Sequence, residues 1–299
     1  MNVDLSDKEI LELELKANEI RQLLIPTLVN AGSGHSGGPL GMADIFTAMY
    51  FHILHHDPKN PDWEDRDRLI LSNGHICPIR YVTMAAAGYF PVEELKTLRK
   101  INSRLQGHPH RTVLPGVETT SGPLGEGLGQ SVGMALAAKL DNKKHYIYCL
   151  TSDGEHQEGS TWEAAMAAGK WKLDNLVEII DYNNIQIDGD IEDIMPLEPF
   201  KAKYESFNWN VIEIDGNDMR AIISAVGQAQ GVHDMPTLIL ARTTPGKGVS
   251  YMENDYRWHG NPPNLLDVPG SPPKAEQADV ALADLKKIEE ELKLQMKEE

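Results

Sequence analysis

Residues 146–155 read YIYCLTSDGE, an apolar run of strand length that ends abruptly in an acidic residue followed by glycine. Residues 176–185 read LVEIIDYNNI, a second such run that ends in two asparagines. Short apolar runs bounded by turn residues are typical of buried β-strands. We therefore expect Asp153 and Asn183 at the carboxyl ends of two strands, where they would face one crevice if the strands are parallel neighbours.

Strand-length runs alternate with helical stretches around these two segments. The predicted helices span residues 159–171 and 218–230, and further strands span residues 211–214 and 237–241. This alternation favours βαβ units, so the predicted fold class is α/β with a parallel sheet between helix layers. Ligands of such sheets bind beyond the carboxyl ends of the strands. The segments after Thr151, Tyr182 and Ala241 are therefore where we expect a site.

The N-terminal region predicts a helix and then a glycine-rich loop. Residues 6–9, SDKE, fit a capping box, and apolar residues recur at helical spacing from Ile10 to Val29. We expect about five turns of helix with a kink or an end near Ile25, because Pro26 lacks a backbone N–H. Residues 32–39, GSGHSGGP, form a loop that leads into a helix predicted at residues 41–54.

Composition narrows the class of protein. The chain of 299 residues carries 45 Asp and Glu against 28 Lys and Arg, a formal net charge of -17. This charge opposes general binding to nucleic acid or to an anionic membrane surface. No stretch approaches the ~20 apolar residues of a membrane span. The two cysteines, Cys77 and Cys149, have no metal-ligand spacing, so a reducing, cytoplasmic setting is the expectation.

The two strand ends together predict a binding site for a hard cation. Mg²⁺ and Ca²⁺ take oxygen ligands, and an Asp carboxylate, an Asn amide oxygen and a backbone carbonyl leave positions for phosphate oxygens and water. Gly154 lets the backbone approach a phosphate without a Cβ. Either dipeptide alone is more typical of an ordinary turn than of a metal site. Their pairing at two strand ends with a helix between favours the metal site.

Glycine-rich and histidine-bearing loops add to this site. Residues 119–129, TTSGPLGEGLG, open a helical run and offer free N–H groups at the positive end of a helix dipole. Four histidines, His35, His75, His108 and His259, stand in loops punctuated by glycine or proline. A single loop histidine is more often an exposed polar residue. Four in such settings can converge on one anionic or carbonyl-bearing ligand.

The spacing of the motifs supports neither a zinc site nor a catalytic nucleophile. The four loop histidines lack the compact spacing of a zinc site, and no Gly-x-Ser-x-Gly elbow accompanies them. The remaining histidines are interpreted as solvated or structural: His52, His55, His56, His110, His145, His156 and His233.

Taken in order, the motifs resemble the N-terminal half of transketolases over residues 15–265. The motifs are SGHSGG at 33–38, LSNGH at 71–75, GHP at 107–109, GVETTSGPLG at 116–125, SDG at 152–154 and DYNNI at 181–185. The Asp-Gly and Asn elements are shared widely among thiamine-diphosphate enzymes. The loop histidines and the Gly-Pro-Leu segment indicate transketolase in particular.

The resemblance implies a thiamine-diphosphate-binding fold, with residues 1–270 as the diphosphate- and metal-binding domain. The amphipathic, charge-laced pattern of residues 274–299 predicts a helix, so residues 271–299 are expected to form a charged helical tail. The resemblance also implies that Mg²⁺, or Ca²⁺, is bound by Asp153, Asn183 and the carbonyl of Ile185. Contacts to the cofactor are implied for two sets of residues. His75, Gly154, Asn183 and His259 would contact the diphosphate, and Gly122, Pro123 and Leu124 the aminopyrimidine side.

For the substrate, the resemblance implies a sugar channel lined by His35, His108 and His259. Glu158 would belong to an acidic relay that reaches across a subunit interface, with a surface glutamate as the alternative. The implied reaction is the transfer of a two-carbon ketol unit from a ketose phosphate to an aldose phosphate.

Three departures from the family pattern stand out. Ser152 replaces the glycine that usually precedes the metal aspartate, and Ser36 replaces a proline after the first loop histidine. The chain is also about half as long as a single-chain transketolase. The activating glutamate for the aminopyrimidine ring is therefore expected from a partner, a C-terminal transketolase subunit, in an α2β2 assembly.

Two other functions remain open at this point. The α-type subunit of a 2-oxo-acid dehydrogenase shares the Asp-Gly and Asn arrangement but gives no role to the four loop histidines. A non-catalytic binding module that keeps the fold for contact with a partner is the second alternative. The motifs do not identify the sugar substrates.

Overall fold

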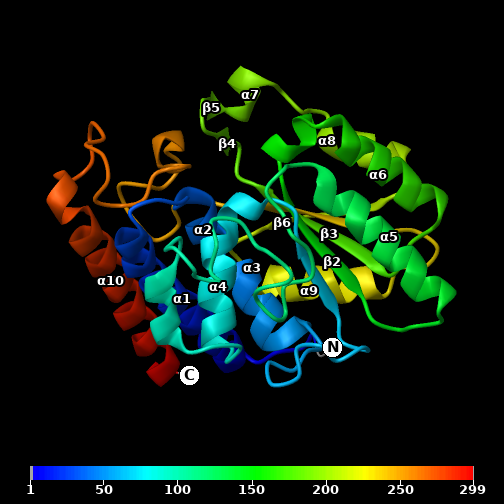
Figure 1. The fold of residues 1–299 in the computed structure, drawn as a ribbon, viewed down its shortest axis with the longest axis horizontal. Helices are drawn as coiled ribbons and strands as arrows, with labels where there is room; N and C mark the ends of the chain where they lie inside the picture. The colour runs from blue at the N-terminus through cyan, green and yellow to red at the C-terminus, as the bar shows by residue number, and fades with distance from the viewer. Residues whose placement is uncertain (1–2, 299) are drawn as a thin grey trace.

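The centre of the molecule is a five-stranded parallel sheet (Figure 1). The computed structural model describes residues 3–298. Met1 and Asn2, the start of the predicted domain 1–270, and Glu299, the end of the predicted tail 271–299, lie outside the described residues. The strands follow the order β1-β2-β3-β7-β6. Their bounds are β1 Arg68–Leu71, β2 Ile147–Ser152, β3 Leu176–Tyr182, β6 Asn210–Asp215 and β7 Thr237–Arg242.

Helices cover both faces of this sheet. The longer helices are α1 Asp7–Ala31, α4 Cys77–Ala86, α5 Glu126–Leu140, α6 Gly159–Lys170, α8 Phe200–Ser206, α9 Met219–Gln230 and α10 Gln277–Glu298. The short helices are α2 Gly37–Gly41, α3 Ala43–Ala48, α7 Ile191–Ile194, the π-helix η1 Met49–Ile53, and the 3₁₀ turns η2 Gly74–Ile76, η3 Val92–Thr97, η4 Gly154–Gln157, η5 Tyr256–Trp258 and η6 Lys274–Glu276.

The strand residues divide between two cores by simple alternation. Tyr148 and Leu150 point into a core shared with α1, α3, α4 and α9. Ile147 and Cys149 point into a second core shared with α5, α6 and α8. Because successive side chains of a strand face opposite ways, a strand buried on both faces reads as a continuous apolar run. The predicted α/β class with a parallel sheet between helix layers is therefore confirmed.

The N-terminal helix corrects one prediction. The capping box at Ser6 is formed, but α1 continues through Pro26 and ends at Ala31, beyond the predicted end near Ile25. Pro26 lies on the exposed side of the helix, where water can satisfy the carbonyl that its missing N–H leaves free. The neighbours Ile25 and Leu28 are fully buried, so tertiary packing outweighs the local cost of the proline.

Helix α10 packs along α1 at one side of the molecule (Figure 1). Asn18 of α1 donates to the carbonyl of Leu285, and Ala281 and Leu285 are buried in the same core as α1. The predicted helix in the C-terminal segment is thus present, while the domain boundary at residue 270 stays a prediction. Between residues 3 and 298, no helix combines the length and the apolar character that crossing a bilayer requires.

Candidate active site

The end of β2, which carries Asp153, lies beside the end of β3, which carries Asn183, as the sequence predicts. Strands β2 and β3 pair in parallel with Ser152 opposite Asp181, which places Asp153 next to the end of β3. The Asp153 N–H donates to the Asp181 carbonyl at 3.3 Å. One oxygen of the Asp153 side chain, Oδ2, accepts the Asn184 N–H at 2.5 Å. The turns after the two strands are therefore joined at the Asp153 carboxylate.

The Asn183 side chain is oriented by its own neighbours. Its Nδ2 donates to Asp181 Oδ2 at 2.9 Å, and its Oδ1 accepts the Ile185 N–H at 3.0 Å. Asn184 adopts a left-handed conformation with φ of 60°, which turns the chain into the short antiparallel hairpin β4 (Ile185–Gln186) and β5 (Gly189–Asp190). Asparagine tolerates this conformation better than most residues do.

Two buried carboxylates share this edge without a cationic side chain. Burial, and then the nearby Asp181, raise the pKa of Asp153 to about 7, although the N–H groups of Asn184 and Gly154 oppose the shift. Burial raises the pKa of Asp181 to about 6. Within the described part of the chain, neither carboxylate forms an ion pair with lysine or arginine. A bound cation would relieve this repulsion and favour the ionised carboxylates.

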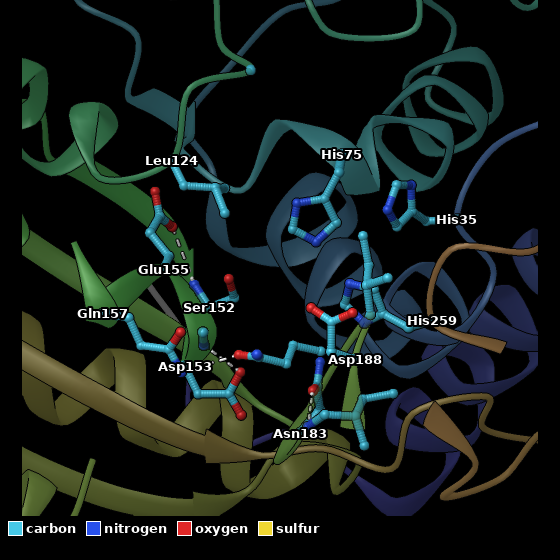
Figure 2. A pocket seen from close by; sticks show the side chains of 15 residues that line it. His35, His75, Leu124, Ser152, Asp153, Glu155, Gln157, Asn183, Asp188 and His259 are labelled. Carbon is cyan, nitrogen blue, oxygen red and sulfur yellow. Dashed lines mark hydrogen bonds between the residues drawn. The ribbon is translucent and has the colours of Figure 1, made fainter. Parts of the chain in front are cut away.

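Three of the four loop histidines meet on the opposite side of the same cavity (Figure 2). His35 follows α1, His75 lies in η2 after β1, and His259 follows η5. The ring centroids are 4.8 Å apart for His35 and His75, 5.3 Å for His35 and His259, and 5.4 Å for His75 and His259. Convergence was predicted for four histidines; three of them do converge, whereas His108 does not line this cavity.

The three imidazoles are held neutral. Burial is the first cause in each case and lowers the pKa of His35 to about 3, that of His259 to about 4, and that of His75 well below its ordinary value. The Nδ1 atoms of His35 and His259 are buried and have no hydrogen-bond partner among the described residues. Such atoms are costly unless a ligand or water satisfies them.

Strand ends and histidines enclose one cavity of about 400 Å³. Most of its lining consists of residues that the sequence singled out. Five further lining residues were missed by sequence reasoning: Glu155, Gln157, Gln186, Ile187 and Asp188. They lie in the turn after Asp153 and in the hairpin after Asn183, so their proximity in sequence to the two strand ends was the available signal.

A family comparison agrees with this geometry. Residues 13–269 match the family described as "Transketolase, thiamine diphosphate binding domain".

The chain belongs to the transketolase family.

Proteins named as transketolase subunits are among its relatives. The 6-deoxy-6-sulfo-D-fructose transketolase subunit SqwG of Clostridium sp. (strain MSTE9) is 42% identical over 255 residues, which cover 85% of this chain and 92% of that protein. One subunit of the apulose-4-phosphate transketolase of Phocaeicola vulgatus is 43% identical over 251 residues, which cover 84% and 89%. The chain therefore has about the extent of these relatives.

Solved transketolases share the fold of this chain but are longer. The transketolase of Leishmania mexicana superposes with a TM-score of 0.81 at 32% identity and that of Campylobacter jejuni with a TM-score of 0.80 at 36% identity. The matched region covers 95% and 94% of this chain but only 45% and 48% of those two proteins. The thiamine-diphosphate-binding fold predicted for this chain is thus confirmed.

Three residues to which the transketolase resemblance assigns a role do not line the cavity: Pro123, His108 and Glu158. Gly122 and Leu124 line the cavity, whereas Pro123 is exposed outside it. His108 is exposed and lies against Gly122, where an added Cβ would stand 3.4 Å from the imidazole Cγ. Glu158 is exposed at the start of α6 and does not line the cavity. The cofactor and catalytic roles of these residues stay predictions.

The two serines that depart from the transketolase pattern have defined contacts. Ser36 is fully buried, and its hydroxyl lies 3.0 Å from the Trp258 carbonyl and 2.6 Å from the Asn261 carbonyl. It thereby connects the loop of His35 to the loop of His259. Ser152 lines the cavity beside Asp153 and adds a hydroxyl there.

The N-terminus of α5 is less available to an anion than the sequence indicates. The Gly125 N–H donates to Glu155 Oε1 at 2.7 Å, and the Gly127 N–H donates to Ser72 Oγ at 2.9 Å. These two donors of the glycine-rich segment are therefore occupied by side chains. A diphosphate is better accommodated at the turn of Asp153 and Gly154, which lines the cavity.

The site fits the cofactor of the family. Over residues 3–298 there is no cluster of three or more His, Cys, Asp and Glu side chains placed to hold a metal. The expected ligand set differs from such a cluster because it combines one carboxylate, one amide oxygen and one backbone carbonyl. That set suits Mg²⁺ shared with a diphosphate, which supplies the remaining oxygens. The unpartnered histidine nitrogens provide further polar groups for the ligand.

Proposed function

We propose that this chain is the thiamine-diphosphate-binding subunit of a two-chain transketolase. The observation that carries the proposal is the single cavity in which Asp153 and Asn183 face His35, His75 and His259. A metal-bound diphosphate requires the first pair, and a polyhydroxylated sugar requires polar groups such as the histidines. The reaction would transfer a two-carbon ketol unit from a ketose phosphate to an aldose phosphate.

Each set of residues has a role in this proposal. Asp153, Asn183 and the Ile185 carbonyl would hold Mg²⁺, and Gly154, with His75 and His259, would contact the diphosphate. The segment of Gly122, Pro123 and Leu124 would support the aminopyrimidine side. When bound, thiamine diphosphate supplies a carbon nucleophile for attack on the ketose carbonyl.

The substrate would lie among the histidines. Neutral imidazoles donate and accept hydrogen bonds without drawing a proton from solvent near neutral pH, which suits the orientation of sugar hydroxyls. His35 and His259 would also stabilise the oxyanion that develops at the carbonyl, because preorganised donors act strongly in a buried site. His108, at the border of the cavity, would line the channel farther from the reacting carbon.

A partner chain would complete the site. Apolar side chains that line the cavity stand exposed: Leu124 is 37% exposed and Ile187 67%. Met195, at the end of α7, is 57% exposed. A C-terminal transketolase subunit would cover them and supply the glutamate that activates the aminopyrimidine ring. Glu158, exposed beside this surface, would take part in a relay between subunits. We propose an α2β2 assembly that works in the cytoplasm, where the buried thiols of Cys77 and Cys149 stay reduced.

The test is reconstitution with the partner. The chain and its co-expressed C-terminal partner are supplied with thiamine diphosphate, Mg²⁺, a ketose phosphate and an aldose phosphate. We expect ketol transfer with both chains together and none with either alone. Turnover of pyruvate with a lipoyl acceptor instead would identify a 2-oxo-acid dehydrogenase subunit. An assembled complex that binds no cofactor would indicate a binding module.

A further inference from the structure

A buried glutamate, Glu155, connects three loops at the edge of the cavity. It is fully buried and follows the metal-site residue Asp153 by two positions. Its Oε1 accepts the Ser72 hydroxyl and the Gly125 N–H, the latter at 2.7 Å. Its Oε2 accepts the Ser152 N–H at 3.3 Å. One carboxylate therefore joins the loop before His75, the start of α5 and the end of β2.

The geometry of these bonds suits a carboxylate and no other side chain of similar size. All three groups that bond Glu155 are donors, and the carboxylate offers two acceptor oxygens to them. Ser72 extends the network, because its oxygen accepts the Gly127 N–H while its proton goes to Glu155. Glu155 and Ser72 thus satisfy N–H groups at the start of α5 that no local side chain caps.

Close packing also joins two of these three segments, the loop before His75 and the start of α5. A Cβ at Gly127 would overlap the Ser72 side chain, and a Cβ at Gly74 would overlap the Ser121 hydroxyl. The loops approach one another at distances that only glycine permits. A small shift of either segment is therefore transmitted to the other. The segment 122–124 is attached directly to this packed region.

We propose that Glu155 is a positioning residue that fixes the distance between the metal-binding turn and the segment 122–124. This inference rests on the proposed function, in which the turn holds the diphosphate end of the cofactor and the segment supports the aminopyrimidine end. A cofactor that spans both parts binds well only when their separation is set in advance. Glu155 and its partner Ser72 set that separation through hydrogen bonds to both.

The first experiment compares two ligands of the complex with its partner. Calorimetry measures the affinity for thiamine diphosphate and for inorganic pyrophosphate, each with Mg²⁺, in the wild type and in Glu155→Gln. Glutamine keeps the volume but has one acceptor oxygen, so one of the three donors meets an amide NH₂. We expect about 10-fold weaker binding of thiamine diphosphate, the scale for loss of a group that supports a metal site, and little change for pyrophosphate, which does not extend to the segment 122–124.

The matched control is Glu163→Gln, which removes an exposed carboxylate on α6 and should change neither affinity. In steady-state assays, Glu155→Gln should raise the KM for thiamine diphosphate while kcat at saturating cofactor stays close to that of the wild type. Unchanged affinity for thiamine diphosphate would overturn the proposal. An equal loss of affinity for both ligands would do so as well, because it would show that Glu155 supports only the part of the site that binds the diphosphate.

Hydrogen exchange tests the inference without any cofactor. In Glu155→Gln, the amides of Gly125 and Gly127 should exchange faster, while the amides of α1 and α10 should not. Equal exchange in both proteins would contradict the inference. If the wild-type complex binds neither thiamine diphosphate nor pyrophosphate, the proposed function fails, and the exchange rates still decide whether Glu155 holds the loops together.

Discussion

The two edges of the β-sheet each carry a cavity lined by histidines and carboxylates, yet they differ in how their polar groups are satisfied. The cavity at the amino ends of the strands is the larger, about 750 Å³ against about 400 Å³. Its lining includes His55, Asp65, Asp67 and His145. Volume and residue type alone would therefore point to the amino edge.

Hydrogen bonding distinguishes the two cavities. At the amino edge, Asp67 accepts the N–H groups of His55 and Tyr146 at 2.9 and 2.8 Å, and Asp65 forms an ion pair with Lys143 at 2.7 Å. At the carboxyl edge, the adjacent buried carboxylates Asp153 and Asp181 have no cationic partner among the described residues, and the rings of His35 and His259 each leave a buried Nδ1 without a partner. At the amino edge, one ring nitrogen, Nδ1 of His145, is likewise buried without a partner. The paired carboxylates and the clustered imidazoles together therefore mark the carboxyl edge as the place for a ligand.

The largest effect should follow removal of the carboxylate proposed to bind the metal. Asp153→Ala leaves the cation without its carboxylate ligand, and the affinity for thiamine diphosphate with Mg²⁺ should fall by more than about 100-fold, beyond the usual range for groups that only support a ligand. Calorimetry on the complex measures this loss. The matched change at the amino edge, Asp65→Ala, should leave the affinity unchanged. An equal loss of cofactor affinity in both variants would show that the carboxyl edge is not the binding site in preference to the amino edge.

Acidification should reveal the neutral state of the histidine cluster. Burial lowers the pKa of His259 from 6.5 to about 4. Between pH 6.5 and pH 4, this imidazole is therefore protonated in the unfolded chain but neutral in the folded chain. The stability supplied by the neutral ring is complete above pH 6.5 and is lost as the pH falls towards 4. His259→Asn removes this group. The carboxylates Asp153 and Asp181, whose pKa values are raised, act in the opposite direction but are common to both proteins.

Denaturant unfolding of the two ligand-free proteins isolates the histidine contribution. The free energy of unfolding of the wild type relative to His259→Asn should drop by up to about 3 kcal/mol between pH 6.5 and pH 4, since one unit of pKa shift is worth about 1.4 kcal/mol. A difference that is constant over this pH range would show that the ring is protonated in the folded protein.

Glycine substitutions test how closely the loops of the carboxyl edge approach each other. Gly127→Ala places a Cβ 2.7 Å from the Ser72 Cα, a backbone atom, so it should destabilise the chain by about 2 kcal/mol. Gly129 lies in the same helix with open space around it. Gly129→Ala should therefore stabilise by up to about 1 kcal/mol through helix propensity. Thermal unfolding compares the two variants, and a similar Tm for both would refute the tight packing.

The smallest effect is expected at the amino edge. Asp67→Asn removes one of two acceptor oxygens, so the His55 or the Tyr146 N–H loses a partner at a cost of about 1 kcal/mol. The free energy of unfolding should fall by that amount, while cofactor affinity and ketol transfer stay unchanged. A large loss of activity in this variant would place a functional site at the amino edge as well.

Local sequence was sufficient for four of the five strands of the sheet and for ten of the fifteen residues that line the cavity, whereas strand β1 was not predicted. Asp153 and Asn183 were identified because each ends an apolar run, and parallel pairing then brings the two ends together. The histidines were identified because their loops are punctuated by glycine and proline. The same reasoning did not show that the imidazole of His108 stays exposed while the other three rings are partly or largely buried, because burial depends on how distant loops pack.

Contacts between distant segments account for what sequence reasoning missed. Glu155 bonds Ser72, which lies 83 positions away, and Gly125, which lies 30 positions away. Nothing in its neighbourhood in the sequence predicts either contact. Helix α1 passes through Pro26 for a similar reason, since its buried face against α3, α4 and α10 outweighs one missing hydrogen bond.

The most direct test of the account is a crystal structure of the complex with thiamine diphosphate and Mn²⁺ in place of Mg²⁺. Anomalous scattering would locate the metal independently of the protein atoms. We predict one metal peak about 2 Å from an Asp153 carboxylate oxygen, Asn183 Oδ1 and the Ile185 carbonyl oxygen, with diphosphate oxygens completing the shell. A metal bound elsewhere, or a diphosphate seated away from the ends of β2 and β3, would contradict the account.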